Sequence, residues 1–163
     1  MRTALYILIG VFTFLVQALL LPRLFHTNWQ PDLFLAWVVI LSLLRGRRIG
    51  IAVAIIAGLV QDILVSNLFG LHFFPYIVVA YICSIWTHTV YEEQWYVSFF
   101  WVVAVTIVVS IMQFCMLWLG RADVQLLGFV WYHTWPALWL NGLLGIGLHE
   151  FVWKLTAEDE YIW

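Results

Sequence analysis

The sequence predicts an all-α integral membrane protein, residues 1–163 forming one polytopic domain that folds as a compact bundle of about six transmembrane helices. The first observation behind this prediction is composition. Hydrophobic residues make up 65% of the chain and charged residues only 10%, whereas about a quarter of the residues in a typical globular protein are charged. Because the chain lacks the polar residues that would cover a soluble domain, the bilayer is its expected solvent.

The second observation is that charges and prolines divide the apolar sequence into segments of membrane-spanning length. The third to sixth segments each contain about 18–25 residues, which is the length that a helix needs to cross a hydrocarbon core about 30 Å thick. Their apolar character is continuous rather than alternating, which favours helices over barrel strands. The six predicted spans are residues 4–25, 31–44, 49–66, 71–90, 95–119 and 136–153.

The first span could be mistaken for a cleavable secretory signal, because Arg2 precedes an apolar run from Ala4 to Leu21. A secretory signal has a shorter apolar region of about 7–15 residues, followed by small residues at the cleavage site. This run ends in Leu-Leu-Leu-Pro instead. We therefore expect it to be retained as the first span.

The second span is short, because its uncharged run from Leu33 to Leu44 would cover only about 18 Å as a helix. It crosses the bilayer only if Pro31 and Asp32 enter the outer part of the membrane, or if the bilayer is thinner there. Asp32 directly follows Pro31, which suits a helix N-cap or first-turn position, where free backbone N–H groups favour a carboxylate.

The third span carries Gly50, Ala54, Gly58 and Asp62 at every fourth position. Residues spaced in this way share one helix face, and small residues there let another helix approach closely. The stripe is interpreted as a packing face. Its neighbour could lie in this chain or in another chain, and an internal neighbour is the simpler expectation.

The last span is predicted to begin at Pro136. The preceding apolar stretch from Leu126 to Tyr132 is interpreted as an interfacial segment. Cations set the expected orientation: with the N-terminus inside, five cations lie at cytoplasmic ends and two in outer loops, which predicts a cytoplasmic N-terminus and C-terminus. The inner cations are Arg2, Arg45, Arg47, Arg48 and Lys154, and the outer ones are Arg23 and Arg121.

Four polar side chains are expected at one level of the membrane. Asp32 and Asp62 lie fifteen positions on either side of Arg47, so an antiparallel hairpin places both about 20 Å from its turn. Gln17 and Asn141 fall in the same layer. These groups could form a ligand, ion or proton site, because ionisable side chains in lipid are usually functional. They could instead cap helices and bond across the bundle, which is the favoured interpretation for Asp32; for Asp62 both remain open.

The sequence predicts no catalytic, cofactor or metal site. His149-Glu150 begins like the helix of a zinc protease, but position 153 is Trp instead of the second histidine. Nucleophile elbows, phosphate-binding glycine loops and Cys-x-x-Cys pairs are also missing from the sequence. Cys83 and Cys115 lie inside apolar runs, which argues against a disulfide framework. A net charge of −2 argues against nucleic-acid binding.

Several of these residues occur in an order that resembles the family of the rod-shape-determining membrane protein MreD. The resemblance is concentrated in residues 30–81, while length and the six-span pattern agree over the rest. The matching features are Gln30-Pro31-Asp32-Leu33, Leu43-Leu44-Arg45-Gly46, Gly50, Gly58-Leu59-Val60-Gln61-Asp62 and Gly70.

The resemblance implies a non-catalytic membrane scaffold of the bacterial elongasome, which builds the lateral cell wall, located in the cytoplasmic (inner) membrane. The implied partners are an MreC-like single-span protein, the actin-like MreB, the glycosyltransferase RodA and a class B penicillin-binding protein. A similarity to the substrate-binding subunits of energy-coupling-factor (ECF) transporters further implies an outward-facing cavity. The expected packing or partner-binding residues are Pro31, Asp32, Gly50, Gly58, Asp62 and Gly70, together with Asn141 from the polar layer.

Two other functions remain as alternatives. A small-molecule-binding membrane subunit of a transporter would use the polar layer, with aromatic residues such as Trp37 and Tyr76 around a pocket. An intramembrane enzyme would use Asp32 and Asp62 as an acid–base pair. The proline beside Asp32 makes the enzyme the least favoured of the three.

Overall fold

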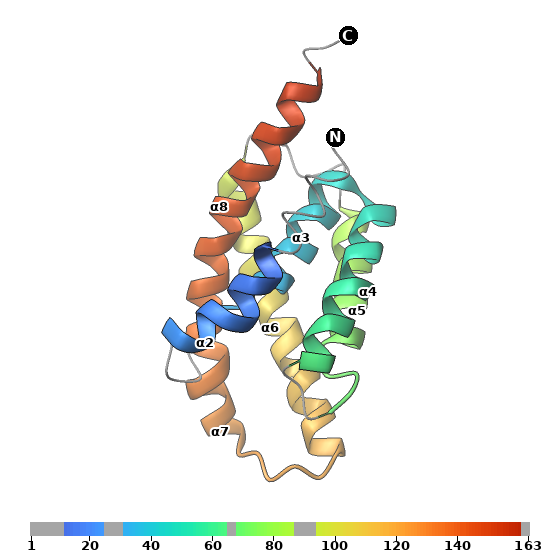
Figure 1. The fold of residues 1–163 in the computed structure, drawn as a ribbon. Helices are drawn as coiled ribbons and strands as arrows, with labels where there is room; N and C mark the ends of the chain where they lie inside the picture. Colours follow the sequence, from blue (N-terminus) through green and yellow to red (C-terminus); the bar gives the residue numbers. More distant parts are fainter. Residues whose placement is uncertain (1–11, 25–30, 65–67, 87–93, 161–163) are drawn as a thin grey trace.

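The structure, a computed structural model, describes residues 12–24, 31–64, 68–86 and 94–160, which are helical apart from turns and short links (Figure 1). No strand occurs in these described parts, which agrees with the predicted helical class. In chain order the elements are η1 (Val16–Leu20), α2 (Leu21–Leu24), α3 (Leu33–Arg45), α4 (Arg47–Leu64), α5 (Phe73–Ile85), α6 (Trp95–Leu119), α7 (Leu126–Phe129), η2 (Val130–Thr134) and α8 (Trp135–Glu160).

Helix α3 forms the centre of the bundle and packs against α4, α5, α6 and α8. Its middle residues Ala36, Val38 and Val39 are completely buried. The predicted N-cap position of Asp32 is confirmed, because its side chain accepts a hydrogen bond of 3.0 Å from the backbone N–H of Leu35. A central helix that is buried over most of its surface explains why this segment is uniformly apolar although it is short.

Helices α3 and α4 are joined by the single residue Gly46, whose φ of 80° lies in a region that favours glycine. This tight link makes the two helices an antiparallel hairpin, as the sequence predicted. The small-residue stripe of α4 faces neighbours in the same chain. A Cβ added at Gly50 would lie 2.8 Å from Ser42 Cα in α3, and one added at Gly58 would lie 2.6 Å from Phe73 Cα in α5.

Helix α5 is shorter than predicted. The sequence placed a span at residues 71–90, but the helix extends only from Phe73 to Ile85, and residues 87–90 lie outside the described part. Its start is later because residues 69–72 form turns that the Asp62 carboxylate holds. At its other end the backbone N–H of Trp86 donates to the Cys83 carbonyl, which closes the last turn.

Helix α6 has the predicted bounds of 95–119. Among the described residues it is the one helix with both the length and the apolar composition needed to cross a membrane. Helices α3 and α5 are apolar but contain only 13 residues each, which corresponds to about 20 Å. Helix α4 has 18 residues and carries Arg47, Arg48 and Asp62.

The prediction that the last span begins at Pro136 is wrong. Elements α7, η2 and α8 follow one another without a break, so the helical backbone continues from Leu126 to Glu160. Pro136 therefore lies inside a helix rather than at its start. Proline cannot donate a hydrogen bond to the preceding turn and its ring crowds that turn, and the wider π-turn of η2 immediately before it is a local adjustment that lets the helix continue.

The first span is described only in part: residues 12–24 are helical, and residues 4–11 of the prediction lie outside the described residues. This segment also contains a π-turn, η1, followed after one residue by Pro22. The same order of π-turn and proline thus occurs in the first and last helices.

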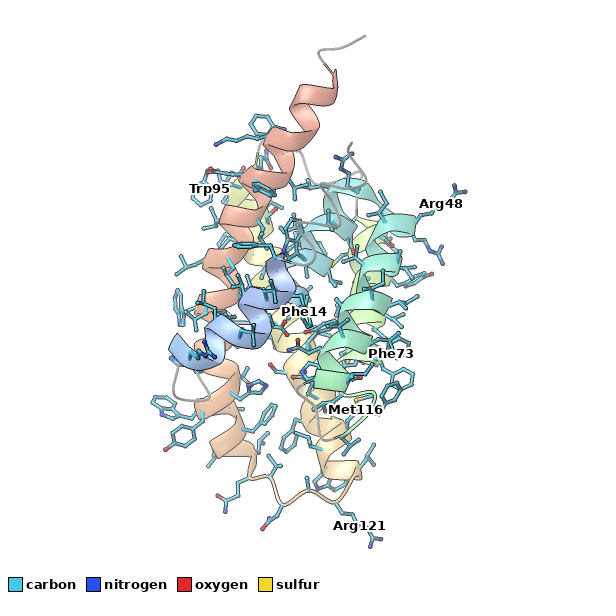
Figure 2. The ribbon with its side chains drawn as sticks, viewed as in Figure 1. Phe14, Arg48, Phe73, Trp95, Met116 and Arg121 are labelled. Atoms are coloured by element: carbon cyan, nitrogen blue, oxygen red, sulfur yellow. The ribbon has the colours of Figure 1, made fainter. Side chains whose placement is uncertain are left out.

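Apolar side chains cover much of the outside of the bundle (Figure 2), and its interior contains both an apolar core and buried polar groups. Large apolar residues are exposed along the helices, with Ile63 and Leu119 each 73% exposed. Exposed apolar surface of this extent is unusual in a soluble monomer. The buried polar residues are Thr13, Gln17, Ser42, Gln61, Asp62, Ser98, Thr106, Ser110, Gln113, Asn141 and His149.

Candidate functional site: a buried polar network

Asp62, near the end of α4, is buried and its carboxylate accepts four hydrogen bonds. Oδ2 accepts from the backbone N–H groups of Gly70 at 2.7 Å and Phe73 at 3.1 Å. Oδ1 accepts from the backbone N–H of His72 at 2.8 Å and pairs with the His72 ring Nδ1 at 3.0 Å. Because a carboxylate has about four acceptor positions, these contacts use its full capacity.

The turn before α5 places these donors around Asp62. Gly70 has a φ of 100°, a backbone conformation that residues with a side chain rarely adopt. The turn directs the N–H groups of residues 70, 72 and 73 toward the same carboxylate. Asp62 thus stabilises the start of α5 from a neighbouring helix, because free N–H groups at a helix N-terminus favour a negative charge.

Asp32 is the second carboxylate of the network. Its Oδ1 caps α3 through Leu35, and its Oδ2 accepts a short hydrogen bond from the Tyr76 hydroxyl of α5. The backbone N–H of Asp32 donates to Asn141 Oδ1 of α8 at 2.6 Å. These contacts connect the start of α3 to two other helices.

Gln17 of η1 and Asn141 of α8 extend the network at its edges. Gln17 Oε1 accepts from the backbone N–H of Leu33 at 3.0 Å, and its Nε2 donates to the Pro31 carbonyl at 3.4 Å. Asn141 Nδ2 donates to the Thr106 hydroxyl of α6 at 3.3 Å. The Pro31-Asp32-Leu33 segment is therefore held from two sides.

The His72 ring connects the two carboxylates. It pairs with Asp62, and its edge faces the Tyr76 ring, with the ring centroids 5.9 Å apart. The predicted layer is thus partly assembled by direct contact: Gln17 and Asn141 both bond to the Pro31–Leu33 segment, which contains Asp32. Asp62 joins them only through His72 and Tyr76.

The remaining predicted residues lie around this network. Pro31 is buried and contributes its carbonyl, whereas Gly70 contributes its N–H. Gly50 and Gly58 lie at close contacts between helices and make no part of the hydrogen-bonded chain. His72 and Thr106 were not among the predicted site residues, and Tyr76 was considered only as part of a pocket.

Two buried side-chain atoms in the described part have no hydrogen-bond partner: Gln61 Oε1 and Thr134 Oγ1. His133, beside Thr134, lies within electrostatic range of Asp32 and His72. Elsewhere, Ser98 Oγ and His149 Nδ1 form a buried pair at 2.7 Å between α6 and α8. No group of His, Cys, Asp and Glu side chains suited to hold a metal ion occurs among the described residues.

Comparison with known proteins decides the family. A family model described as rod shape-determining protein MreD matches residues 1–158. The chain belongs to the MreD family. Membership associates it with the determination of rod shape and with the membrane. No curated protein and no solved structure matches the chain, so its likeness to the ECF substrate-binding subunits stays a prediction.

Proposed function

We propose that this member of the MreD family is a non-catalytic membrane scaffold of the bacterial cell-elongation machinery. One observation carries the non-catalytic part: the buried carboxylate of Asp62 and the partly buried carboxylate of Asp32 are used by the fold itself. Asp62 is surrounded by four N–H donors, and both oxygens of Asp32 accept hydrogen bonds. Contacts with the fold thus occupy both oxygens of each carboxylate, which leaves less of its acceptor capacity for a substrate.

The proposal includes an inner-membrane protein whose six helices span the bilayer, with the N-terminus and C-terminus in the cytoplasm. The apolar exterior supports the membrane location, because exposed Leu, Ile and Phe side chains suit contact with lipid. The turn between α3 and α4 lies at the same end of the bundle as the C-terminal part of α8, while the link from α6 to α7 lies at the opposite end (Figure 1). Arg45, Arg47, Arg48 and Lys154 thus gather at one end, as a cytoplasmic end requires.

The proposed mode of action is docking of partner proteins on the outside of the bundle. An MreC-like single-span protein is the proposed principal partner, and MreB, RodA and a class B penicillin-binding protein are proposed to join the same assembly in lateral peptidoglycan synthesis. Family membership supports this assignment. The structure adds a physical reason: Asp32 and Asp62 bond to other parts of the same fold, which leaves the outer helix faces as the surfaces that partners can recognise.

A gentle affinity purification from native membranes tests the scaffold function. The tagged chain is solubilised in a mild detergent, and bound proteins are identified by mass spectrometry against an untagged control strain. We expect to recover a single-span protein with a large extracytoplasmic region, together with wall-synthesis enzymes. Recovery of a transporter ATPase module in place of these proteins would contradict the scaffold function.

A second candidate, a small-molecule-binding subunit, is favoured by one observation: the unpartnered Gln61 Oε1 and Thr134 Oγ1. Buried polar atoms without partners are unusual in proteins and can mark a site for a ligand. Mass spectrometry of small molecules in the same purified sample tests this candidate. A stoichiometric metabolite that is present in the wild type and lost in Gln61→Leu would support it, whereas equal small-molecule content in both proteins would exclude Gln61 from such a site.

A further inference from the structure

The turn between α3 and α4 concentrates positive charge. Arg45 ends α3, and Arg47 and Arg48 begin α4, so three guanidinium groups occur within four residues. Arg47 and Arg48 are exposed, and Arg45 is partly exposed. Among the described residues, no carboxylate lies within ion-pair distance of any of the three arginines. The ion pairs in this part of the chain are Glu150 with Lys154 and His72 with Asp62, which lie outside the cluster.

The short link between the two helices keeps the three arginines close together, and a ring contact orients one of them. The single-residue link at Gly46 brings the end of one helix directly to the start of the next. The Arg47 guanidinium lies over the ring of Tyr81 in α5, 4.5 Å from the ring centroid. Stacking on a ring face positions a guanidinium while leaving its N–H edge available. Arg48 extends away from the bundle (Figure 2).

An exposed apolar surface begins directly beside this cluster. Ile49 follows Arg48 in α4 and is 45% exposed, and Ile85 at the end of α5 is 63% exposed. The contact between Arg47 and Tyr81 shows that these two helix ends lie at the same end of the bundle. The surface continues along both helices through Ile56, Val78 and Ile82, which are all exposed. Cations that have no carboxylate partner in the described part of the chain, at one end of an apolar surface, match a ligand with an anionic head and hydrocarbon chains.

We propose that Arg45, Arg47 and Arg48 form a binding site for the phosphate of an anionic phospholipid, whose acyl chains lie along the exposed faces of α4 and α5. Guanidinium groups suit phosphate because they donate two parallel hydrogen bonds to it. The apolar surface favours a lipid over free phosphate, which makes no use of it. This inference rests on the membrane location given under the proposed function.

The test compares lipid binding by matched double variants of the full chain, purified in detergent. Each protein is mixed with equal amounts of phosphatidylglycerol and phosphatidylcholine carrying the same acyl chains, and bound lipids are counted by native mass spectrometry. Arg47→Gln/Arg48→Gln removes two charges from the proposed site. Arg23→Gln/Arg121→Gln is the control, because it removes two exposed charges that the sequence assigns to the outer end.

We expect the wild type and the control to prefer phosphatidylglycerol, and Arg47→Gln/Arg48→Gln to lose most of that preference. An arginine near an anionic surface contributes about a five-fold preference, so two correspond to about 25-fold. Arg47→Lys/Arg48→Lys keeps the charges and is expected to retain part of the preference. Equal loss in both Gln double variants would overturn the site in favour of general charge attraction.

Two further results would overturn the proposal in different ways. If soluble glycerophosphoglycerol, added at the same concentration, displaces the phospholipid, the site recognises free phosphate esters and the apolar surface has no part in binding. If the wild type inserts into liposomes but shows no preference for phosphatidylglycerol, the site fails while the membrane location stands. Failure of the wild type to insert into liposomes at all would instead refute the membrane location and the site with it.

Discussion

Replacing Asp62 by Asn is the sharpest test of the structural role assigned to the buried carboxylate. The substitution keeps the size of the side chain but exchanges one acceptor oxygen for an NH₂ donor. Whichever way the Asn amide is turned, that NH₂ group faces at least one backbone N–H, from His72 or from Gly70 and Phe73. At least one buried N–H therefore loses its acceptor, and the remaining bonds lose the help of the negative charge.

The structure allows the size of this effect to be worked out. A buried N–H left without an acceptor costs about 2 kcal/mol, and each of two remaining backbone bonds weakens by about 1 kcal/mol when its acceptor becomes neutral. The sum is about 4 kcal/mol, a large part of the roughly 5–15 kcal/mol that stabilises a typical domain. For a chain of this size, that corresponds to a fall in melting temperature of about 10 °C.

Thermal unfolding in a mild detergent, followed by tryptophan fluorescence, measures this change, since the chain contains 11 tryptophans. All variants are heated at the same rate, because unfolding of such proteins is often irreversible. Asp123→Asn is the matched control: Asp123 is exposed in the link between α6 and α7, and we expect its melting temperature to equal that of the wild type. A melting temperature for Asp62→Asn within about 2 °C of the wild type would refute the capping role.

Three further changes probe the same packing. Gly58→Ala places a methyl group against the Phe73 backbone and should lower the free energy of unfolding by about 1–3 kcal/mol. In the control Gly147→Ala the methyl group enters open space, so that variant should be as stable as the wild type or more stable. Equal melting temperatures for the two variants would contradict the close contact at Gly58. Tyr76→Phe leaves an Asp32 oxygen without its donor and should destabilise by about 1–3 kcal/mol in the same assay. Asp32→Asn should cost less than Asp62→Asn, because the Tyr76 hydroxyl can turn to accept from the new NH₂ group; the reverse order would contradict the assigned contacts.

The bounds of α6 followed from the sequence because one long apolar run fixes both ends of a helix without help from other segments. The start of α5 did not follow in the same way. It depends on the carboxylate of Asp62, ten and eleven residues earlier in the chain, which holds the preceding turn in a non-helical form. Apolar character continues through residues 71 and 72, so hydrophobicity alone could not show where the helix begins.

The last helix shows a different limit of prediction from sequence. The sequence predicts a helix start at Pro136, because proline is favoured in a first turn and disrupts a helix interior. The structure has proline inside the helix and a π-turn at Val130–Thr134 before it. A π-turn has no sequence pattern of the kind that marks a cap or a turn, so this solution was not visible from the residues.

The sequence predicts at which level of the bundle the polar residues lie, but not which of them are hydrogen-bonded to one another. Counting positions from the cationic ends of the helices places Gln17, Asp32 and Asn141 at one level, and Gln17 and Asn141 do bond to the segment that contains Asp32. Depth along a helix does not determine how that helix is rotated about its axis. For this reason the contacts of His72 and Tyr76, which link Asp62 to the rest, could not be derived from the sequence.

The short helices explain why this chain keeps carboxylates in its interior. Helices α3 and α5 contain 13 residues each, so at about 20 Å they are shorter than a hydrocarbon core of about 30 Å. If the bundle spans the membrane, at least one end of each helix lies inside it, away from bulk water. Their first N–H groups then need acceptors from the protein, and Asp32 and Asp62 supply them. On this argument the two aspartates follow from helix length, and the proposed partners would dock on the outer faces of the bundle.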